Sequence, residues 1–530
     1  MRFLRAALLA AAVAPLIAAP FLARGAERAA PARAGRAPAR LVIITPHNEQ
    51  IRHEFGLAFE RWWAQTHDGP TVTVDWRAPG GTSEIRKLLE SQYIRAVRGG
   101  AIAPDGACDP GAMPYDILFG GGAYEHDVVK KGVSVELAAT GPDGKPLRAA
   151  VPMSVPARLT DDELKEIFPE NRIGQGVLHD PQKFWLGAAL TAFGIGFNRD
   201  VIRELGVPEP STWDDLTDRR YAGRLAMTDP RQSGSVATTY DSILNAYGWE
   251  KGWRVLRGMA ANARFFANTS LKPPLEISSG EAAAGPVLEF YGRYQSQSLL
   301  KPGQKPEGSR LGYVDPPGMV FIDSDPISIL RGGPNPEAAL EFVRFALSEQ
   351  GQALWQFKKH SGLALDTGYP VSDDALQYDW GPDKFELRRM PVRRSMYEKF
   401  RDRFVDRDLR PFEIVSKAPL MGWRPLVIPM FSAFAIDIHA DMREAWDAMG
   451  RAAAAHADPS LLAELDAIFY AMPPHPLKDG ATAPFAEANF KVIRDDWRDP
   501  RRETDLRMAY TAFFRERYRE VTRRAREAGY

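Results

Sequence analysis

The chain has 530 residues, with 68 Lys and Arg against 68 Asp and Glu, and 45% of its residues are hydrophobic. A chain of this length exceeds what one hydrophobic core organises, which predicts two or three domains. The balanced charge argues against nucleic acid as a partner. The one cysteine, Cys108, has no internal disulfide partner, so cysteine content does not indicate the compartment.

The first 25 residues have the order of a secretory signal peptide. Residues 1–5 are basic, residues 6–22 are apolar, and Ala23 and Gly25 are the small residues expected before a cleavage site. Removal of this segment leaves 65 basic against 68 acidic residues. We therefore expect an exported, periplasmic protein in which residues 26–40, rich in Ala, Arg and Pro, form a disordered leader.

From residue 41 the sequence alternates strand and helix patterns, which is typical of an α/β fold. The first three expected strands end in loops rich in Asn, Ser, Thr or Gly, and ligands of open α/β sheets bind at such carboxyl ends. Strands are expected at 41–45, 71–76, 115–119, 184–197, 225–228, 263–267, 282–290 and 319–323, and a helix at 336–347.

After about residue 360 strand patterns fade and helical patterns dominate, for example at 433–455 and 504–526. Residues 361–530 are therefore expected to form a mainly helical C-terminal extension. Its arginine-rich end is interleaved with glutamate, which favours a solvated helix face over a binding patch.

Five short segments stand out: FGIGFN at 193–198, PSTWDDL at 210–216, YAGR at 221–224, TDPRQSGS at 228–235 and DPISILRGGPNPEAA at 325–339. Together they resemble the bacterial extracellular solute-binding proteins of ABC importers, in the ferric-iron-type and organophosphonate-type branch. Each segment is weak evidence alone, but their order and spacing between residues 41 and about 355 are specific.

The resemblance implies a periplasmic type II fold, in which two α/β lobes close by hinge motion on a ligand. Lobe one would comprise residues 41–145 and 320–360, and lobe two residues 146–319, with the chain crossing between lobes within 133–158 and again within 309–325. The implied partners are an ABC permease, which provides the only membrane contact, its ATPase subunit and a small-molecule ligand. The resemblance implies no cofactor, and we expect a monomer.

Candidate ligand-binding residues lie in loops that precede expected helices, where exposed N–H groups suit an anion. Gly80-Gly81-Thr82-Ser83 and Ser233-Gly234-Ser235 are two such loops, and Thr82 or Ser83 is expected to cap the first helix. Arg231 is a possible charged donor beside the second loop. Tight turns explain each loop equally well. The full set of candidates is His47, Asn48, Glu49, Gly81, Thr82, Ser83, Gly121, Gly122, Arg231, Ser233, Gly234, Ser235 and Tyr291.

Iron is the main alternative ligand. The iron-binding relatives present adjacent tyrosines, whose phenolates are hard ligands for a ferric ion, and this chain has Phe290 before Tyr291 at the corresponding place. The tyrosine pair is therefore broken. Tyr291, Tyr294 and His47 remain weak metal candidates, and we predict no metal and an organic anion such as a phosphate or phosphonate ester instead.

No metalloprotease, P-loop or nucleophile-elbow motif occurs in the sequence. We therefore expect a binding protein rather than an enzyme. A secreted hydrolase would have to use His47, Glu49 and a carboxylate such as Asp229 or Asp315. A ligand sensor that reports a solute to a membrane signalling partner is the other alternative.

Overall fold

The computed structural model describes residues 39–140, 146–299, 304, 308–358, 381–416 and 419–530. The predicted signal peptide and residues 26–38 of the predicted leader lie outside the described residues. Ala39 and Arg40, the last two residues of the predicted leader, are part of the first strand, because the Ala39 N–H donates to Thr71 O at 2.9 Å.

Lobe one is built on three parallel strands, β1 (Ala39–Ile44), β2 (Val72–Arg77) and β3 (Ile117–Phe119). Helix α2 (Glu49–Thr66) buries Ile51, Phe55 and Phe59 on one face of this sheet, whereas α3 (Thr82–Arg98) and α4 (Ala123–Lys131) pack on the other. The lobe also contains β4 (Val133–Thr140), β5 (Pro146–Val151), β6 (Ser154–Val155), α5 (Asp161–Ile167), β7 (Arg172–Ile173), β8 (Gly176–Val177), α11 (Pro336–Leu347) and α12 (Glu349–Gln356).

Lobe two repeats the arrangement with the parallel strands β10 (Leu225–Thr228), β11 (Ala263–Ala267) and β12 (Ala284–Leu288). The two long helices of this lobe carry Tyr240 and Trp253, which are fully buried in the main hydrophobic core. The remaining elements are α6 (Arg199–Leu205), η1 (Trp213–Thr217), η2 (Arg219–Tyr221), α7 (Gly234–Tyr247), α8 (Trp249–Asn262), α9 (Lys272–Ser279), α10 (Glu289–Ser298) and β13 (Leu311–Val314).

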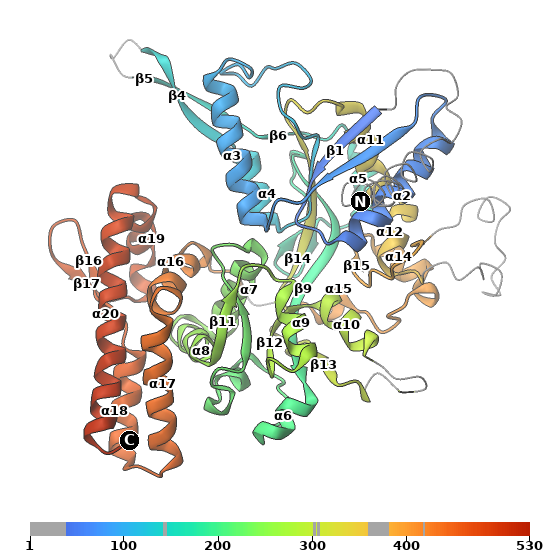
Figure 1. Cartoon of the computed structure of the whole chain (residues 1–530). Coiled ribbons are helices and arrows are strands. Elements are labelled where there is room, and N and C mark those ends of the chain that lie inside the picture. The colour runs from blue at the N-terminus through green and yellow to red at the C-terminus, as the bar shows by residue number, and fades with distance from the viewer. Residues whose placement is uncertain (1–38, 141–145, 300–303, 305–307, 359–380, 417–418) are drawn as a thin grey trace, which may run out of the picture.

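Two long antiparallel strands, β9 (Leu186–Asn198) and β14 (Ile322–Leu330), join the lobes (Figure 1). β9 is buried along its whole length, pairing with β14 through its first half and with β12 through its second. The sheet therefore runs in the order β11-β10-β12-β9-β14-β3-β1-β2. The predicted α/β fold of the type II kind, with two lobes and a helical C-terminal region, is confirmed.

The first crossing of the chain between the lobes lies later in the structure than the sequence analysis predicted. β4 pairs with β5, and β6 pairs with β14 in lobe one, while α5 contacts α11 through Glu163 and Arg344. Residues 146–177 thus pack with lobe one rather than lobe two, and β9 carries the chain across. The strand expected at 319–323 begins at Ile322 and extends to Leu330.

Residues 381–416, which we call the strap, lie across lobe one and reach the junction between the lobes. The strap contains β15 (Met390–Pro391), which pairs with β9, followed by α14 (Arg394–Lys399), η4 (Arg401–Arg403) and α15 (Pro411–Ile414). Its start is held by the buried carboxylate of Glu54, which accepts the backbone N–H groups of Asp383, Lys384 and Phe385 at 2.5–2.9 Å.

The chain ends in a helical bundle that stands beside lobe two (Figure 1). The helix expected at 433–455 is interrupted by a short 3-10 turn, so the apolar stretch Arg424–Ala454 forms two helices rather than one long one. The bundle comprises α16 (Arg424–Phe434), η5 (Ile436–Ile438), α17 (His439–Ala454), α18 (Pro459–Tyr470), β16 (His475–Pro476), β17 (Thr482–Ala483), η6 (Glu487–Asn489), α19 (Phe490–Arg498) and α20 (Pro500–Glu527).

One bundle residue, Arg424, contacts both lobes. Its Nη2 donates to Glu125 Oε1 in lobe one at 3.1 Å and to Gly234 O in lobe two at 3.0 Å. Its guanidinium also lies 3.4 Å from the centre of the Tyr124 ring. The bundle is therefore attached at the junction of the lobes as well as to lobe two.

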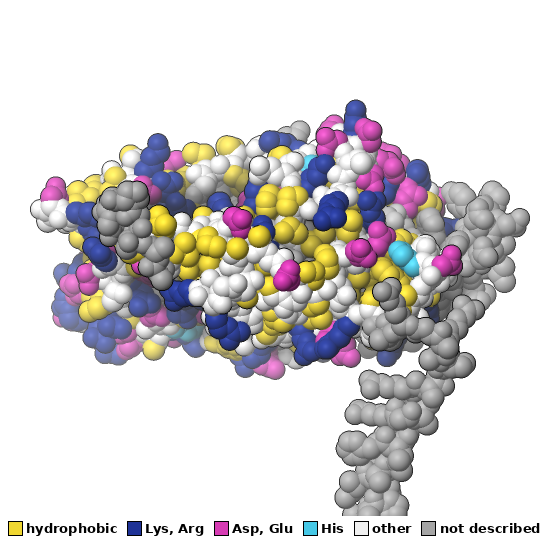
Figure 2. All heavy atoms as spheres, turned by 90° about the horizontal axis from the view of Figure 1, so that it is seen from above, with side chains coloured by type: hydrophobic (Ala, Val, Ile, Leu, Met, Phe, Trp, Pro, Cys, Tyr) yellow, Lys and Arg dark blue, Asp and Glu magenta, His cyan; other side chains and the backbone are white. Residues whose placement is uncertain are grey.

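The outer face seen from above in Figure 2 carries basic and acidic side chains interspersed among hydrophobic ones. Among the described residues drawn in this view, both signs of charge occur side by side.

We expect Glu54→Ala to lower the free energy of unfolding by about 2–4 kcal/mol, because three strap N–H groups lose a charged acceptor. Urea unfolding of the full chain measures this. Glu60→Ala, on the same helix, is the control: Glu60 accepts one N–H, from Val74 at 2.9 Å. Equal losses in the two variants would contradict the role of Glu54 as the anchor of the strap.

Candidate functional site

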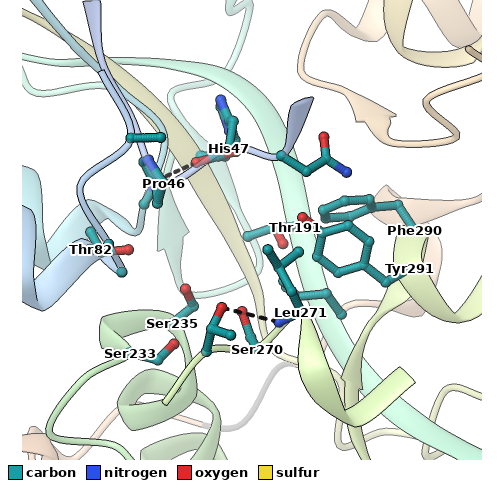
Figure 3. A pocket seen from close by; sticks show the side chains of 18 of the residues that line it. Pro46, His47, Thr82, Thr191, Ser233, Ser235, Ser270, Leu271, Phe290 and Tyr291 are labelled. Atoms are coloured by element: carbon teal, nitrogen blue, oxygen red, sulfur yellow. Dashed lines mark hydrogen bonds and ion pairs between the residues drawn. The ribbon is translucent and has the colours of Figure 1, made fainter. Parts of the chain in front are cut away.

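A cavity of about 430 Å³ lies between the lobes, at the carboxyl ends of β1, β2, β10 and β11 (Figure 3). Both lobes contribute polar side chains and backbone. Its lining consists of Pro46, His47, Asn48, Glu49, Arg52, Ala78, Gly80, Gly81, Thr82, Glu84, Gly121, Thr191, Ser233, Ser235, Asn268, Thr269, Ser270, Leu271, Leu288, Phe290, Tyr291, Asp325 and Arg389.

On the lobe-one side, the amino ends of α2 and α3 meet the cavity. Asn48 caps α2 by accepting the Ile51 N–H at 3.0 Å, and Gly81 is the N-cap of α3, in place of the expected Thr82 or Ser83. The Gly81 N–H donates to Glu84 at 3.1 Å. A side chain at Gly81 would lie 2.5 Å from Gln232 O of lobe two, so glycine permits this close approach of the lobes.

The turn after β3 places a backbone donor at the rear of the cavity. Gly121 has φ of +119°, a conformation that favours glycine. Its N–H donates to Asp325 Oδ1 at 2.6 Å. The preceding carbonyl, Gly120 O, contacts His126 Nε2 at 3.2 Å, and burial lowers the pKa of His126 to about 4.

On the lobe-two side, the amino end of α7 faces the cavity. Ser233 is the N-cap of this 14-residue helix but makes no side-chain capping hydrogen bond, and Ser235 lies in its first turn. Figure 3 shows both serines below Thr82, with Ser270 and Leu271 of the loop after β11 beside them. Helix amino ends from opposite lobes therefore border the same space.

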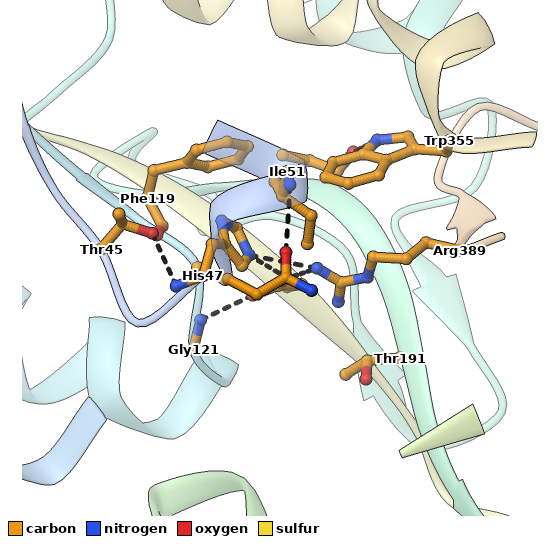
Figure 4. Close-up of polar contacts among 12 residues, drawn as sticks. Thr45, His47, Ile51, Phe119, Gly121, Thr191, Trp355 and Arg389 are labelled. Carbon is orange, nitrogen blue, oxygen red and sulfur yellow. Dashed lines mark hydrogen bonds and ion pairs between the residues drawn. The ribbon is translucent and has the colours of Figure 1, made fainter. Parts of the chain in front are cut away.

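A buried charged cluster closes the rear of the cavity (Figure 4). Asp325 of β14 forms an ion pair with Arg389 of the strap and contacts His47 Nε2 at 2.9 Å. Burial alone would raise the pKa of Asp325, but the charge of Arg389 and then His47 hold it well below its usual range. Burial lowers the pKa of His47, although its contact with Asp325 opposes this shift.

A second carboxyl group, Glu289, lies beside this cluster at the start of α10. Its Oε2 accepts the Ala192 N–H at 3.0 Å, and its Oε1 has no hydrogen-bond partner among the described residues. Burial raises the pKa of Glu289 to about 7, against the opposing charge of Arg389. Glu289 is therefore largely protonated below neutral pH.

The cavity lining includes most of the predicted candidates: His47, Asn48, Glu49, Gly81, Thr82, Gly121, Ser233, Ser235 and Tyr291. Four others, Ser83, Gly122, Arg231 and Gly234, do not line it. Ser83 is buried within α3, Gly122 borders a smaller neighbouring cavity, and Gly234 packs against Glu125.

The structure contradicts the expected role of Arg231 as a donor to the ligand. Its guanidinium is bound by Asp229, at 2.8–3.0 Å, and by Asp437 of the bundle at 3.0 Å. Asp229 lies only two residues earlier, so local pairing turns the arginine away from the cavity.

The three metal candidates are not brought together. His47 and Tyr291 line the cavity, whereas Tyr294, one turn along α10 from Tyr291, does not. Burial raises the pKa of Tyr291 well above its usual value, although the charge of Arg389 lowers it. Among the described residues, no group of three or more His, Cys, Asp or Glu side chains is placed to hold a metal ion.

The sequence analysis did not predict Arg389, Thr191 or Arg52, and it included Asp325 only within the segment 325–339. Arg389 follows another arginine in a segment without a motif, so no local signal marks it. Thr191 lies inside the apolar strand β9, where a lone hydroxyl that borders the lobe boundary was the available signal.

Residues 160–379 match the family model described as bacterial extracellular solute-binding protein. The predicted resemblance to this family is confirmed. The matched residues include β9, lobe two and β14, and they end before the strap.

Two curated relatives match shorter parts of the chain. An uncharacterized protein of Haemophilus influenzae is 27% identical over 227 residues, which are 43% of this chain and 60% of that protein. The phosphoglycerate transport regulatory protein PgtC of Salmonella typhimurium is 24% identical over 176 residues, which are 32% of this chain and 40% of that protein. The chain thus matches less than two thirds of the length of each.

A solved structure, the periplasmic binding protein AfuA of Actinobacillus pleuropneumoniae with exogenous fructose-6-phosphate bound, is 18% identical with a TM-score of 0.45. The similarity covers 60% of this chain and 82% of AfuA.

The raised pKa of Glu289 predicts a loss of stability at high pH. The folded chain retains this proton up to about pH 7, whereas an unfolded Glu releases it near pH 4.5. The contribution is therefore fully present below the unfolded pKa and lost as the pH rises through the folded pKa. Glu289→Gln removes this loss. We therefore expect the free energy of unfolding of the variant, relative to that of the unmodified chain, to be about 1–3 kcal/mol higher at about pH 8 than at about pH 5.

Thermal unfolding at both pH values measures this difference. Glu281→Gln is the control, because Glu281 is an exposed partner of Arg264. A pH dependence that Glu289→Gln leaves unchanged would show that Glu289 ionises normally in the folded protein.

Proposed function

We propose that this protein is the periplasmic substrate-binding component of an ABC-type importer and captures a small anionic solute between its lobes. An ABC permease would recognise the closed form, and an ATPase partner would drive release. Support comes from the family match over residues 160–379, the two-lobed fold and the interlobe cavity.

The observation that carries the proposal is the convergence of helix amino ends from both lobes on one cavity. The α3 end at Gly81 and Thr82 belongs to lobe one, and the α7 end at Ser233 and Ser235 to lobe two. Helix amino ends carry unpaired N–H groups and a partial positive charge, which suit an oxyanion. An anion held by both ends would favour lobe closure.

The cavity lining has three carboxylates, Glu49, Glu84 and Asp325, against two guanidinium groups, Arg52 and Arg389, and the groups at its rear disfavour a ferric ion. The Arg389 guanidinium contacts His47 Nε2 at 3.1 Å and opposes a cation beside that ring. The raised pKa of Tyr291 also disfavours the phenolate that ferric iron prefers. An organic phosphate, phosphonate or carboxylate fits these groups better.

We further propose that binding occurs without chemical turnover. His47 is the imidazole of the cavity, and its neighbours are Asp325 and Arg389. The side-chain nucleophiles of the lining are the hydroxyls of residues such as Thr82, Ser233 and Ser235, and no His ring nitrogen is hydrogen-bonded to any of them among the described residues. This arrangement supports a receptor rather than a hydrolase.

A matched set of probes tests the ligand class: 3-phosphoglycerate, glycerol 3-phosphate, D-glycerate and ferric citrate. We expect at least one phosphorylated probe to raise the melting temperature at saturating concentration, because a ligand stabilises the folded state by mass action. Calorimetry and product analysis should show stoichiometric binding without turnover. Stabilisation by ferric citrate alone would reverse the choice of ligand.

We expect Ser233→Ala together with Ser235→Ala to weaken binding of the stabilising probe about 5- to 50-fold, as two hydroxyl donors are lost. Isothermal titration calorimetry measures the affinity. The double variant Ser278→Ala and Ser279→Ala is the control, because these hydroxyls bond to carbonyls of α9 away from the cavity. Unchanged affinity in the first variant would remove the α7 end from the site.

A further inference from the structure

We propose that Arg389, delivered by the strap, is the specificity-determining residue that binds the oxyanion of the ligand. This inference rests on the proposed function and identifies a ligand-binding cation beyond residue 379, where the family match ends. The C-terminal region would then be a working part of the binding site rather than an appendage to it.

The strap is fixed on both sides of Arg389. The Arg389 N–H donates to Trp355 O at 3.0 Å, and β15 begins at the next residue and pairs with β9. Gln352 Oε1 then accepts the Val392 N–H at 2.8 Å, while Gln352 Nε2 donates to Ala188 O at 2.7 Å. These bonds tie the strap to the crossing strand β9, so the backbone of Arg389 has a defined position beside the lobe boundary.

The residue before Arg389 has a strained backbone. Arg388 has φ of +54°, in the left-handed region that costs a non-glycine residue about 1–3 kcal/mol. Its side chain forms an ion pair with Asp406 of the strap and donates to Arg293 O of α10 at 2.8 Å. Two consecutive arginines are thus directed to different places, Arg388 toward α10 and Arg389 into the cavity.

The Arg389 guanidinium is held in place but keeps unused donors. Its side chain is 3% exposed, and it lies 4.5 Å from the Phe290 ring centre and 5.1 Å from that of Trp355. Its Nη1 contacts Asp325 and His47, whereas its buried Nε has no partner among the described residues. Figure 4 shows the guanidinium beside His47, with Thr191 below it, and both Arg389 and Thr191 line the cavity.

A purely structural role for Arg389 explains less. The contacts of Arg389 with Asp325 and His47 both use Nη1, so the ion pair alone does not account for the buried Nε, which has no partner among the described residues. The planar guanidinium has five N–H donors in a geometry that matches carboxylate and phosphate groups. A cation fixed by two rings and an ion pair at the cavity wall is preorganised for such a group.

The test compares Arg389→Gln and Arg389→Lys in the full chain, with the probes 3-phosphoglycerate, glycerol 3-phosphate and D-glycerate. We expect Arg389→Gln to lower the affinity for the probe that stabilises the unmodified protein, by about 10- to 100-fold. Arg389→Lys keeps the charge and the pairing with Asp325, and should retain the fold and recover part of the affinity. Comparing the three probes shows whether a phosphate or a carboxylate contacts Arg389.

Arg393→Gln is the matched control. Arg393 lies on the same strap, has a 9% exposed side chain and pairs with Glu166 and Leu347 O, and it does not line the cavity. We expect it to lower the melting temperature without changing affinity. Unchanged affinity in Arg389→Gln, alongside binding by the unmodified protein, would overturn the role of Arg389 alone; failure of every probe to bind the unmodified protein would overturn the proposed function and this inference with it.

Discussion

The buried ion pair between Asp325 and Arg389 is the interaction on which the site depends. Asp325 lies on the returning strand β14, and Arg389 lies on the strap more than sixty residues later. Gly121 of the turn after β3 and His47 after β1 complete the cluster. Removing two charges from water is costly unless each gains several partners. The pair is therefore stable only when lobe one, the crossing strand and the strap have assembled together.

The parts of the fold that depend on local pattern could be predicted from the sequence. Strands β1, β2, β10 and β11 were found because alternation and flanking turns mark them. The first crossing was placed too early because the pairing of the short strand β6 with β14, which keeps residues 154–155 in lobe one, is a long-range contact that no local pattern marks. β9 is buried on both faces for thirteen residues, which is typical of a central strand and was the signal for the crossing.

The site divides in the same way. Thr82, Ser233 and Ser235 could be predicted because helix amino ends after strands have a local signature. Arg389 could not, because its position depends on Glu54, Trp355 and Gln352, which are distant in sequence. Arg231 was misjudged for the opposite reason. Arg231 follows a strand that ends at the cavity, but its guanidinium pairs with Asp229, two residues earlier in the chain.

Phe290 occupies the position at which the iron-binding relatives have one tyrosine of a pair. In the structure its ring face lies against the Arg389 guanidinium. An aromatic face without a hydroxyl group favours a cation and offers no oxygen to a metal. One residue thus removes a hard metal ligand and supports the guanidinium next to the cavity. The two consequences favour the same class of ligand, an oxyanion, and they act at the same wall of the cavity.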